Sequence, residues 1–244
     1  MLVTISHFDK AFIQYINQFA YHSKLFDKLV VLLSHNDLLK GGVFVLLICW
    51  GWFKVDERQA LNRSLIVTTF FSSFIAEFVT RAVSFLAPFR FRPEHDQNLN
   101  FILPYNTTPA IMDGWSSFPS DHAALFFALS TGLFFISRKV GIFAFLYTVI
   151  FIALPRTYMG LHYPSDLIAG ALIGIAGAVC ANVYMSRSNI VRFVTQSADS
   201  YPEYFYPVFV LSWCQVYELF WSARELVSRV PGFLKGVLAY IYGA

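Results

Sequence analysis

Long apolar stretches constrain this chain more than any other feature of its sequence. A helix that crosses the hydrocarbon core of a bilayer needs about 20 mostly apolar residues. Five stretches reach or approach that length, namely 41–53 with its flanks, 64–87, 122–136, 140–154 and 165–185. We therefore predict an all-α fold, in which the helices form a polytopic membrane bundle.

The composition agrees with a lipid environment. Of the 244 residues, 57% are hydrophobic and only 14% are charged, whereas soluble domains carry about 25% charged residues. No polar stretch is long enough to form a second domain, and a net charge of +3 is too small to indicate nucleic acid as a partner. Cys49, Cys180 and Cys214 all lie in apolar runs, so we interpret them as small hydrophobic side chains rather than as disulfides or metal ligands.

Segments near the two ends of the chain are less clearly membrane-spanning. The stretch 12–33 would add a sixth span, but Gln14, Asn17, Lys24 and Lys28 interrupt it. Between 204 and 229, polar residues recur at three- and four-residue steps and share one helical face. Such a helix more often lies in the membrane interface, although a seventh span also fits. We predict about six transmembrane helices in 1–200 and an amphipathic membrane helix in 201–244; residues 1–10 lack the pattern of a cleavable signal peptide.

Every second connection between the predicted spans is basic, which sets the orientation. Cytoplasmic connections are enriched in lysine and arginine. The basic side chains in these connections are Lys54, Arg58, Arg63, Arg138, Lys139, Arg187 and Arg192. The intervening connections, 88–121 and 155–164, are therefore predicted to lie outside the cytoplasm.

The two outer connections and the adjoining helix ends carry the residues that suggest chemistry. These are Arg81, Arg90, Arg92, Ser120, Asp121, His122, Arg156, His162 and Asp166. Planar guanidinium groups match phosphate oxygens bidentately, and two histidines can share the roles of nucleophile and leaving-group acid. This combination favours phosphate chemistry.

The start of the last long helix is predicted to place one histidine. Pro164 suits the first helical position, which makes Tyr163 the N-cap and leaves His162 just outside the helix. Asp166 is then the third helical residue, whose carboxylate reaches back over the helix start. We expect this carboxylate to accept a hydrogen bond from His162 and to fix its tautomer.

The start of the helix at 122–136 is predicted to form an anion site. Ser120 is a suitable N-cap. The backbone amides of Asp121 and His122 would then be unpaired and directed outward, where they could bind a phosphate group.

These residues resemble the type-2 phosphatidic-acid phosphatase superfamily of membrane lipid phosphatases. The family carries three motifs: lysine, six residues, then Arg-Pro; Pro-Ser-Gly-His; and Ser-Arg, five residues, His, three residues, Asp. The matching segments here, in the same order, are Arg92-Pro93, Pro119-Ser120-Asp121-His122, and Arg156 with His162 and Asp166. The resemblance spans most of 64–185.

The resemblance implies a covalent phosphohistidine mechanism without a metal or other cofactor. In that mechanism His162 attacks phosphorus, Asp166 orients His162, and His122 protonates the leaving oxygen and then activates water. The phosphoryl oxygens would be held by Arg92, Arg156, Ser120 and the amide of Asp121.

The sequence departs from the family motifs at three positions. The family lysine would fall at Phe85, so we expect Arg81, one helical turn earlier, or Arg90 to replace it. Asp121 stands where the family has glycine, and we expect its carboxylate to point away from the site. Pro155 replaces the motif serine, so Arg156 would work with one hydroxyl fewer.

The resemblance predicts a hydrolase acting on a lipid phosphate or pyrophosphate, with membrane lipids and the substrate as partners. The bacterial inner membrane is the expected location, with the active site on the outer face; a homo-oligomer is compatible with the sequence. Undecaprenyl pyrophosphate, phosphatidylglycerol phosphate, phosphatidic acid and lipid A phosphates are candidate substrates. Three alternatives stay open: a lipid-to-lipid phosphotransferase, metal-dependent hydrolysis, and a transporter that binds headgroups without chemistry. The arginines could also simply contact headgroups at span ends.

Overall fold

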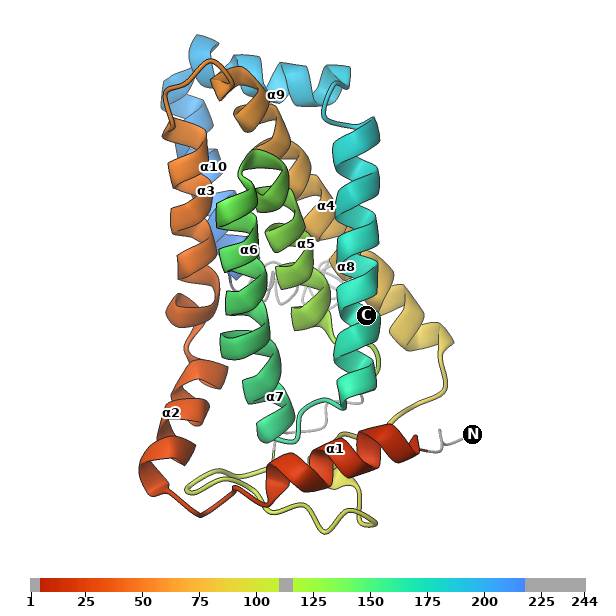
Figure 1. Cartoon of the computed structure of the whole chain (residues 1–244). Coiled ribbons are helices and arrows are strands. Elements are labelled where there is room, and N and C mark those ends of the chain that lie inside the picture. The colour runs from red at the N-terminus through yellow and green to blue at the C-terminus, as the bar shows by residue number, and fades with distance from the viewer. Residues whose placement is uncertain (1–4, 110–115, 218–244) are drawn as a thin grey trace, which may run out of the picture.

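The computed structural model describes residues 5–109 and 116–217, and every regular element within these ranges is helical. The predicted all-α class is confirmed. The α-helices are α1 (His7–Asn17), α2 (Lys24–His35), α3 (Val43–Phe53), α4 (Gln59–Leu86), α5 (Asp121–Ile136), α6 (Arg138–Tyr147), α7 (Leu154–Tyr158), α8 (Pro164–Tyr184), α9 (Asn189–Ser200) and α10 (Pro202–Tyr217). Two π-helical segments, η1 (Leu38–Gly42) and η3 (Thr148–Ala153), and the short 3₁₀-helix η2 (Pro93–His95) complete the order shown in Figure 1.

Several helices have the length and composition of membrane spans. These are α4, the continuous run Arg138–Tyr158 that joins α6, η3 and α7, and α8. Lys24–His35 and Leu38–Phe53 pass the same test together, as a pair bent by 69°. α5 is apolar but has only 16 residues.

The predicted single span at 12–33 is wrong. α1 ends at Asn17, and Tyr21 adopts a positive φ of 66° before α2 begins at Lys24. The side chain of Ser23 caps α2 by accepting from the amide of Phe26, which fixes a new helix start within the stretch. α1 consequently lies across one end of the bundle, whereas α2 leads into α3 (Figure 1).

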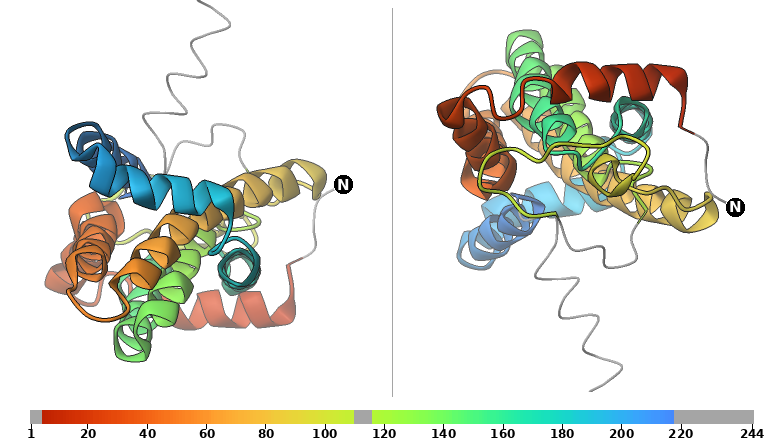
Figure 2. Two further views of the ribbon diagram at one scale, coloured as in Figure 1. Left: turned by 90° about the horizontal axis from the view of Figure 1, so that it is seen from above. Right: turned by 90° about the horizontal axis from the view of Figure 1, so that it is seen from below.

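α5 forms the centre of the bundle and is in contact with α3, α4, α6 and α8 (Figure 2). Small residues let α8 approach α5 closely: a Cβ at Gly170 would lie 2.2 Å from the carbonyl oxygen of Ser120, and one at Gly174 would lie 2.1 Å from that of Ala124. Such small-residue interfaces allow helix backbones to meet without large side chains between them. The starts of α5 and α8 are therefore held side by side.

The two ends of the bundle differ in what they carry. Figure 1 shows α1 and the described part of the α4–α5 connection at one end, toward which α5 and α8 begin. The turns after α3, α5 and α8, which hold the basic segments, lie at the opposite end. The basic connections thus lie at one end of the bundle and the motif-bearing connections at the other, as their alternation along the sequence predicted.

The helix that lies across the basic end is α9, whereas α10 packs lengthwise against α3 and α4 (Figure 1). The ring of Phe205 stacks on Trp52 at 5.3 Å, and Trp213 packs edge-on against Phe70. The tail was expected to favour the interface over spanning; its described part runs along the bundle, and residues 218–229 lie outside the described residues.

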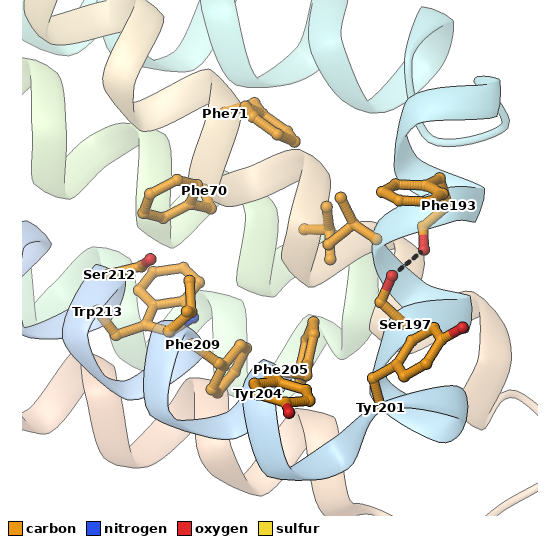
Figure 3. Close-up of a pocket in the computed structure, with 13 residues that line it drawn as sticks. Phe70, Phe71, Phe193, Ser197, Tyr201, Tyr204, Phe205, Phe209, Ser212 and Trp213 are labelled. Atoms are coloured by element: carbon orange, nitrogen blue, oxygen red, sulfur yellow. Dashed lines mark hydrogen bonds between the residues drawn. The ribbon is translucent and has the colours of Figure 1, made fainter.

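α4, α9 and α10 enclose a pocket of about 550 Å³ (Figure 3). Aromatic rings dominate its lining, among them Phe70, Phe193 and Trp213. The hydroxyl of Ser197, which also faces it, donates to the carbonyl of Phe193 over 2.9 Å. The described residues of the lining supply hydroxyl groups but no basic side chain, so this lining is not suited to phosphate.

Candidate active site

The two motif histidines are brought together by the close packing of α5 on α8. The backbone N–H of Ser120 donates to the carbonyl of Asp166 over 3.1 Å, which joins the first turns of the two helices. Ser120 caps α5 by accepting from the amide of Ala123, as predicted. His122 on the first turn of α5 and His162 just before α8 thus belong to one site.

A tight turn brings Arg156 to the same site. Arg156 lies on α7, and Gly160, with φ of 72°, reverses the chain before His162. The carbonyl of Gly160 accepts a hydrogen bond from the amide of Glu94, which ties this turn to the α4–α5 connection. A Cβ at residue 160 would lie 2.7 Å from the ring of Phe101, so the turn suits glycine for both conformation and space.

The His162 imidazole is buried and held in one tautomer. Its Nδ1 lies 2.9 Å from the backbone carbonyl oxygen of Ser117. A carbonyl can only accept, so Nδ1 must donate its proton, which leaves the lone pair on Nε2. Nε2 is therefore the atom available as a nucleophile.

Asp166 does not hydrogen-bond directly to His162, contrary to prediction, because the nearest distance to Nδ1 is 3.9 Å. Its carboxylate does cap the start of α8, as predicted, by accepting from the amide of Tyr163 at 2.8 Å. The same carboxylate accepts from the Ser117 hydroxyl at 2.6 Å. Asp166 thus holds the residue whose carbonyl orients His162.

Burial and the nearby charge of Arg156 lower the pKa of His162 to about 3, compared with about 6.5 for an unperturbed histidine. A neutral imidazole is the reactive form of a histidine nucleophile. His162 is therefore ready to attack throughout the neutral range without first losing a proton.

We expect the His162 ring to stay neutral from pH 8 to pH 5 in phosphate-free detergent solution. Since the pKa of the folded state lies below that of the unfolded state, the unfolded chain binds more protons between about pH 6.5 and 3, and the fold loses stability as pH falls through that window. Histidine ring ¹³C shifts, assigned by comparison with His162→Gln, measure the titration. A His162 midpoint near 6.5 would contradict the expectation.

His122 is held by the carboxylate of its neighbour. Asp121 Oδ1 lies 2.9 Å from His122 Nδ1 and 2.7 Å from its backbone nitrogen, so the amide of His122 is already paired. The prediction that the Asp121 carboxylate points away from the site is wrong, because the carboxylate faces His122. The guanidinium of Arg156 contacts the other ring nitrogen, His122 Nε2.

The two arginines proposed as the lysine replacement, Arg81 and Arg90, are both paired with carboxylates. Arg81 hydrogen-bonds to Asp121 at 2.6 Å and to Glu77 at 3.3 Å. Arg90 is buried and forms ion pairs at 2.6 Å with Asp9 and at 2.5 Å with Asp166. Their guanidinium groups pair with carboxylates within the fold.

Arg92 and Arg156 fit phosphate binding better. The Nε of each is buried and has no hydrogen-bond partner within 5–109 and 116–217. The Nε of Arg90 is likewise unpaired, but both terminal nitrogens of Arg90 already bind carboxylates. Buried donors usually have partners, so the unpaired Nε atoms of Arg92 and Arg156 point to a missing ligand. Both guanidinium groups are close enough to act electrostatically on His162.

Lys40 is a basic residue of this site that the sequence interpretation missed. It lies on the π-helical segment η1, is only 5% exposed, and pairs with Asp37 at 2.8 Å. Its charge acts on Arg156 and Asp121. π-helical segments inside helices often occur at functional sites, but the sequence signal here, a lysine before two glycines in a predicted span, does not identify its target.

We expect Lys40→Met to lower kcat/KM for a lipid phosphate by about 10–100-fold, mainly through KM, because a charged hydrogen bond contributes about 1.5–3 kcal/mol. Lys40→Arg, which keeps the charge, should lose less. Asp37 is half exposed, so the methionine variant leaves no buried carboxylate unpaired and should fold. Equal activity of the methionine variant and the unaltered protein would remove Lys40 from the site.

Comparisons with known proteins identify relatives of this chain. Residues 62–190 match the model of the PAP2 superfamily. The bacitracin transport permease protein BcrC of Bacillus licheniformis is 29% identical over 126 residues, 50% of this chain and 56% of that protein. The lipid A 4'-phosphatase of Bacteroides thetaiotaomicron is 40% identical over 94 residues, 37% of this chain and 41% of that protein. The chain thus spans about half the length of these curated relatives. The crystal structure of Aquifex aeolicus LpxE aligns with a TM-score of 0.53 and 24% identity, covering 75% of this chain and 100% of that one.

Proposed function

Because this chain belongs to the PAP2 superfamily, we propose that it is an integral membrane phosphatase that hydrolyses a phosphomonoester or pyrophosphate of a membrane lipid. The observation that carries the proposal is the fixed tautomer of His162. Its Nδ1 donates to Ser117, which directs the Nε2 lone pair into a site that also contains His122, Arg92 and Arg156.

The proposed reaction has two steps. His162 Nε2 forms a bond to phosphorus, the bond from phosphorus to the lipid oxygen breaks, and that oxygen takes the Nε2 proton of the His122 imidazolium, which leaves His122 neutral. Water then attacks the phosphohistidine, His122 Nε2 takes a proton from the water, and the electron pair of the P–N bond returns to His162. Arg92, Arg156 and Lys40 stabilise charge on the phosphoryl oxygens, which is the main requirement of phosphoryl transfer.

An apolar pocket supports a lipid substrate. The pocket has a volume of about 740 Å³ and lies between the α1–α2 region and the η3–α7 region, with Ile16, Phe26 and Leu154 in its lining. It extends to Pro155, the residue directly before Arg156. A lipid tail in this pocket would place its headgroup beside the phosphate-binding side chains.

We place the site on the periplasmic or outer face of a bacterial inner membrane. The basic connections gather at the end of the bundle opposite α1 (Figure 1), and basic connections favour the cytoplasm. Cysteines introduced near Asn98 should react with an impermeant maleimide from outside, and those near Arg58 should not. The reverse labelling would place the site in the cytoplasm.

A panel of purified lipid phosphates tests the activity and the substrate class together. We propose undecaprenyl pyrophosphate, phosphatidylglycerol phosphate, phosphatidic acid and a lipid A phosphate as probes, assayed in detergent for free phosphate with excess EDTA. Release from at least one lipid supports the proposal. Transfer of labelled phosphate only to an acceptor lipid would indicate a phosphotransferase, and binding without turnover would indicate a transporter.

A further inference from the structure

The carboxylate of Asp121 makes a direct contact that the carboxylate of Asp166 does not. Asp121 Oδ1 lies 2.9 Å from His122 Nδ1, whereas the Asp166 carboxylate is 3.9 Å from His162 Nδ1. The histidine that contacts a carboxylate is therefore His122, to which the proposed mechanism assigns proton transfer, and not the nucleophile His162. The position is glycine in the motif that the chain resembles, so this partner is not supplied by the motif itself.

Asp121 is itself fixed from two sides. Its Oδ1 also accepts from the backbone N–H of His122 at 2.7 Å, while Oδ2 accepts from Arg81 at 2.6 Å. Arg81 is in turn held by Glu77 on the same helix. These bonds leave the carboxylate little freedom to turn away from the imidazole.

The contact determines which ring nitrogen can exchange a proton with substrate. A carboxylate accepts, so Nδ1 of His122 donates to Asp121, and Nε2 carries the exchangeable site. The other charged groups that face His122 are Arg156, at Nε2, and Lys40, both positive. A positive imidazolium beside two cations is unfavourable, and the negative charge of Asp121 at Nδ1 offsets part of that cost.

We propose that Asp121 is a positioning residue for His122, which it orients through Nδ1 and whose protonated form it stabilises during leaving-group protonation and water activation. This inference rests on the phosphohistidine mechanism proposed above. By this inference the Asp121 carboxylate acts in proton transfer, whereas other residues bind the phosphate oxygens.

The effect of replacing Asp121 should depend on the leaving group of the substrate and on the reaction step. Expulsion of an alkoxide from a monoester requires a proton, whereas a phosphate expelled from a pyrophosphate requires little help. We expect Asp121→Asn to lower turnover of phosphatidic acid by about 10²-fold, since general acid–base catalysis contributes about 10²–10⁴-fold. With diacylglycerol pyrophosphate, phosphoprotein formation should fall by less than about fivefold, while its hydrolysis falls by about 10²-fold, given that water activation still needs His122.

Rapid-quench assays with the ³²P-labelled forms of these two lipids measure the steps separately, through labelled protein and free phosphate. Accumulation of labelled phosphoprotein in Asp121→Asn, matched by His122→Ala, supports the proposal. In the Asp121→Asn/His122→Ala double variant the loss should not exceed that of His122→Ala alone, because both changes remove one function.

Other outcomes overturn the proposal. Equal losses in both steps and with both lipids would mean that Asp121 only maintains the site, as would losses that add in the double variant. Recovery of turnover in Arg81→Gln/Asp121→Asn would mean that Asp121 serves only to neutralise Arg81. A labelled phosphoprotein that persists in His162→Ala would instead contradict the mechanism proposed for the whole site, whichever result Asp121→Asn gives.

Discussion

Replacing His162 by alanine is expected to lower phosphate release from a lipid substrate by at least about 10⁴-fold and to abolish labelled phosphoprotein, because loss of a nucleophile leaves only binding and charge stabilisation. The Nδ1 of His162 is engaged with Ser117, which leaves Nε2 as the nucleophilic atom that this substitution removes. Rapid-quench labelling and steady-state phosphate release measure the two effects.

His35→Ala is the matched control for this variant. His35 is exposed at the end of α2, and its one hydrogen bond to the described residues is local, with Nδ1 at 3.0 Å from the carbonyl oxygen of Val31. Its removal should leave turnover within about twofold of that of the unaltered protein, because substitutions at the surface usually change the free energy little. Unaltered phosphate release by His162→Ala would defeat the proposed chemistry.

Replacing Arg90 by methionine is expected to destabilise the fold by about 3–5 kcal/mol, because it leaves two buried carboxylates without their cation. Asp9 and Asp166 are at most 1% exposed, and Arg90 is 6% exposed. Arg90 also hydrogen-bonds to the Ser165 hydroxyl and lies 4.1 Å from the ring centroid of Tyr163. For a chain of this length the loss corresponds to a fall in thermal midpoint of roughly 10 °C, measured in detergent at neutral pH.

The pH dependence of the stability of Arg90→Met tests whether the loss of stability comes from the unpaired carboxylates. Burial alone would raise the pKa of Asp9, but hydrogen bonds from Ser165 and Arg90 hold it below its ordinary value. The stabilisation it provides in the unaltered protein is therefore present at neutral pH and lost as pH falls through that pKa. In Arg90→Met the buried carboxyl of Asp9 has lost its cation and should favour the protonated form. The difference in the free energy of unfolding between the unaltered protein and Arg90→Met should therefore become smaller as the pH falls.

Asp199→Asn provides a control for this stability loss. Asp199 is 73% exposed where it pairs with Arg63 at 3.0 Å, and exposed ion pairs contribute little. We expect Asp199→Asn to change the free energy of unfolding by less than about 1 kcal/mol. A similarly small change for Arg90→Met would mean that its two carboxylate contacts do not hold the end of the bundle together.

Local rules correctly predicted the features that depend on neighbouring residues. Proline at the first helical position and aspartate at the third gave the start of α8 and the cap formed by Asp166. Serine at the N-cap gave the start of α5. These features are set by backbone groups only a few residues away, so the sequence contains the information needed to identify them.

Contacts between distant segments were not predictable in the same way. Arg90 and Arg92 are two residues apart, yet one pairs with α1 and α8 and the other lies near His162. Their directions depend on the path of the connection, which is set by the bonds of Arg90 to Ser116 and Ser117 across 26 and 27 residues. The orientation of His162 likewise comes from a backbone carbonyl 45 residues away, which no spacing of side chains could indicate.

The bend between α2 and α3 has a consequence for chimeric proteins. It places Lys40 near His122, yet both Lys40 and Asp9 precede the family-matched segment 62–190. Transplanting only that segment into another scaffold would carry the three motifs but leave behind Lys40 and Asp9, one of the two carboxylates that pair with Arg90. The unit to be exchanged intact therefore includes α1 and η1.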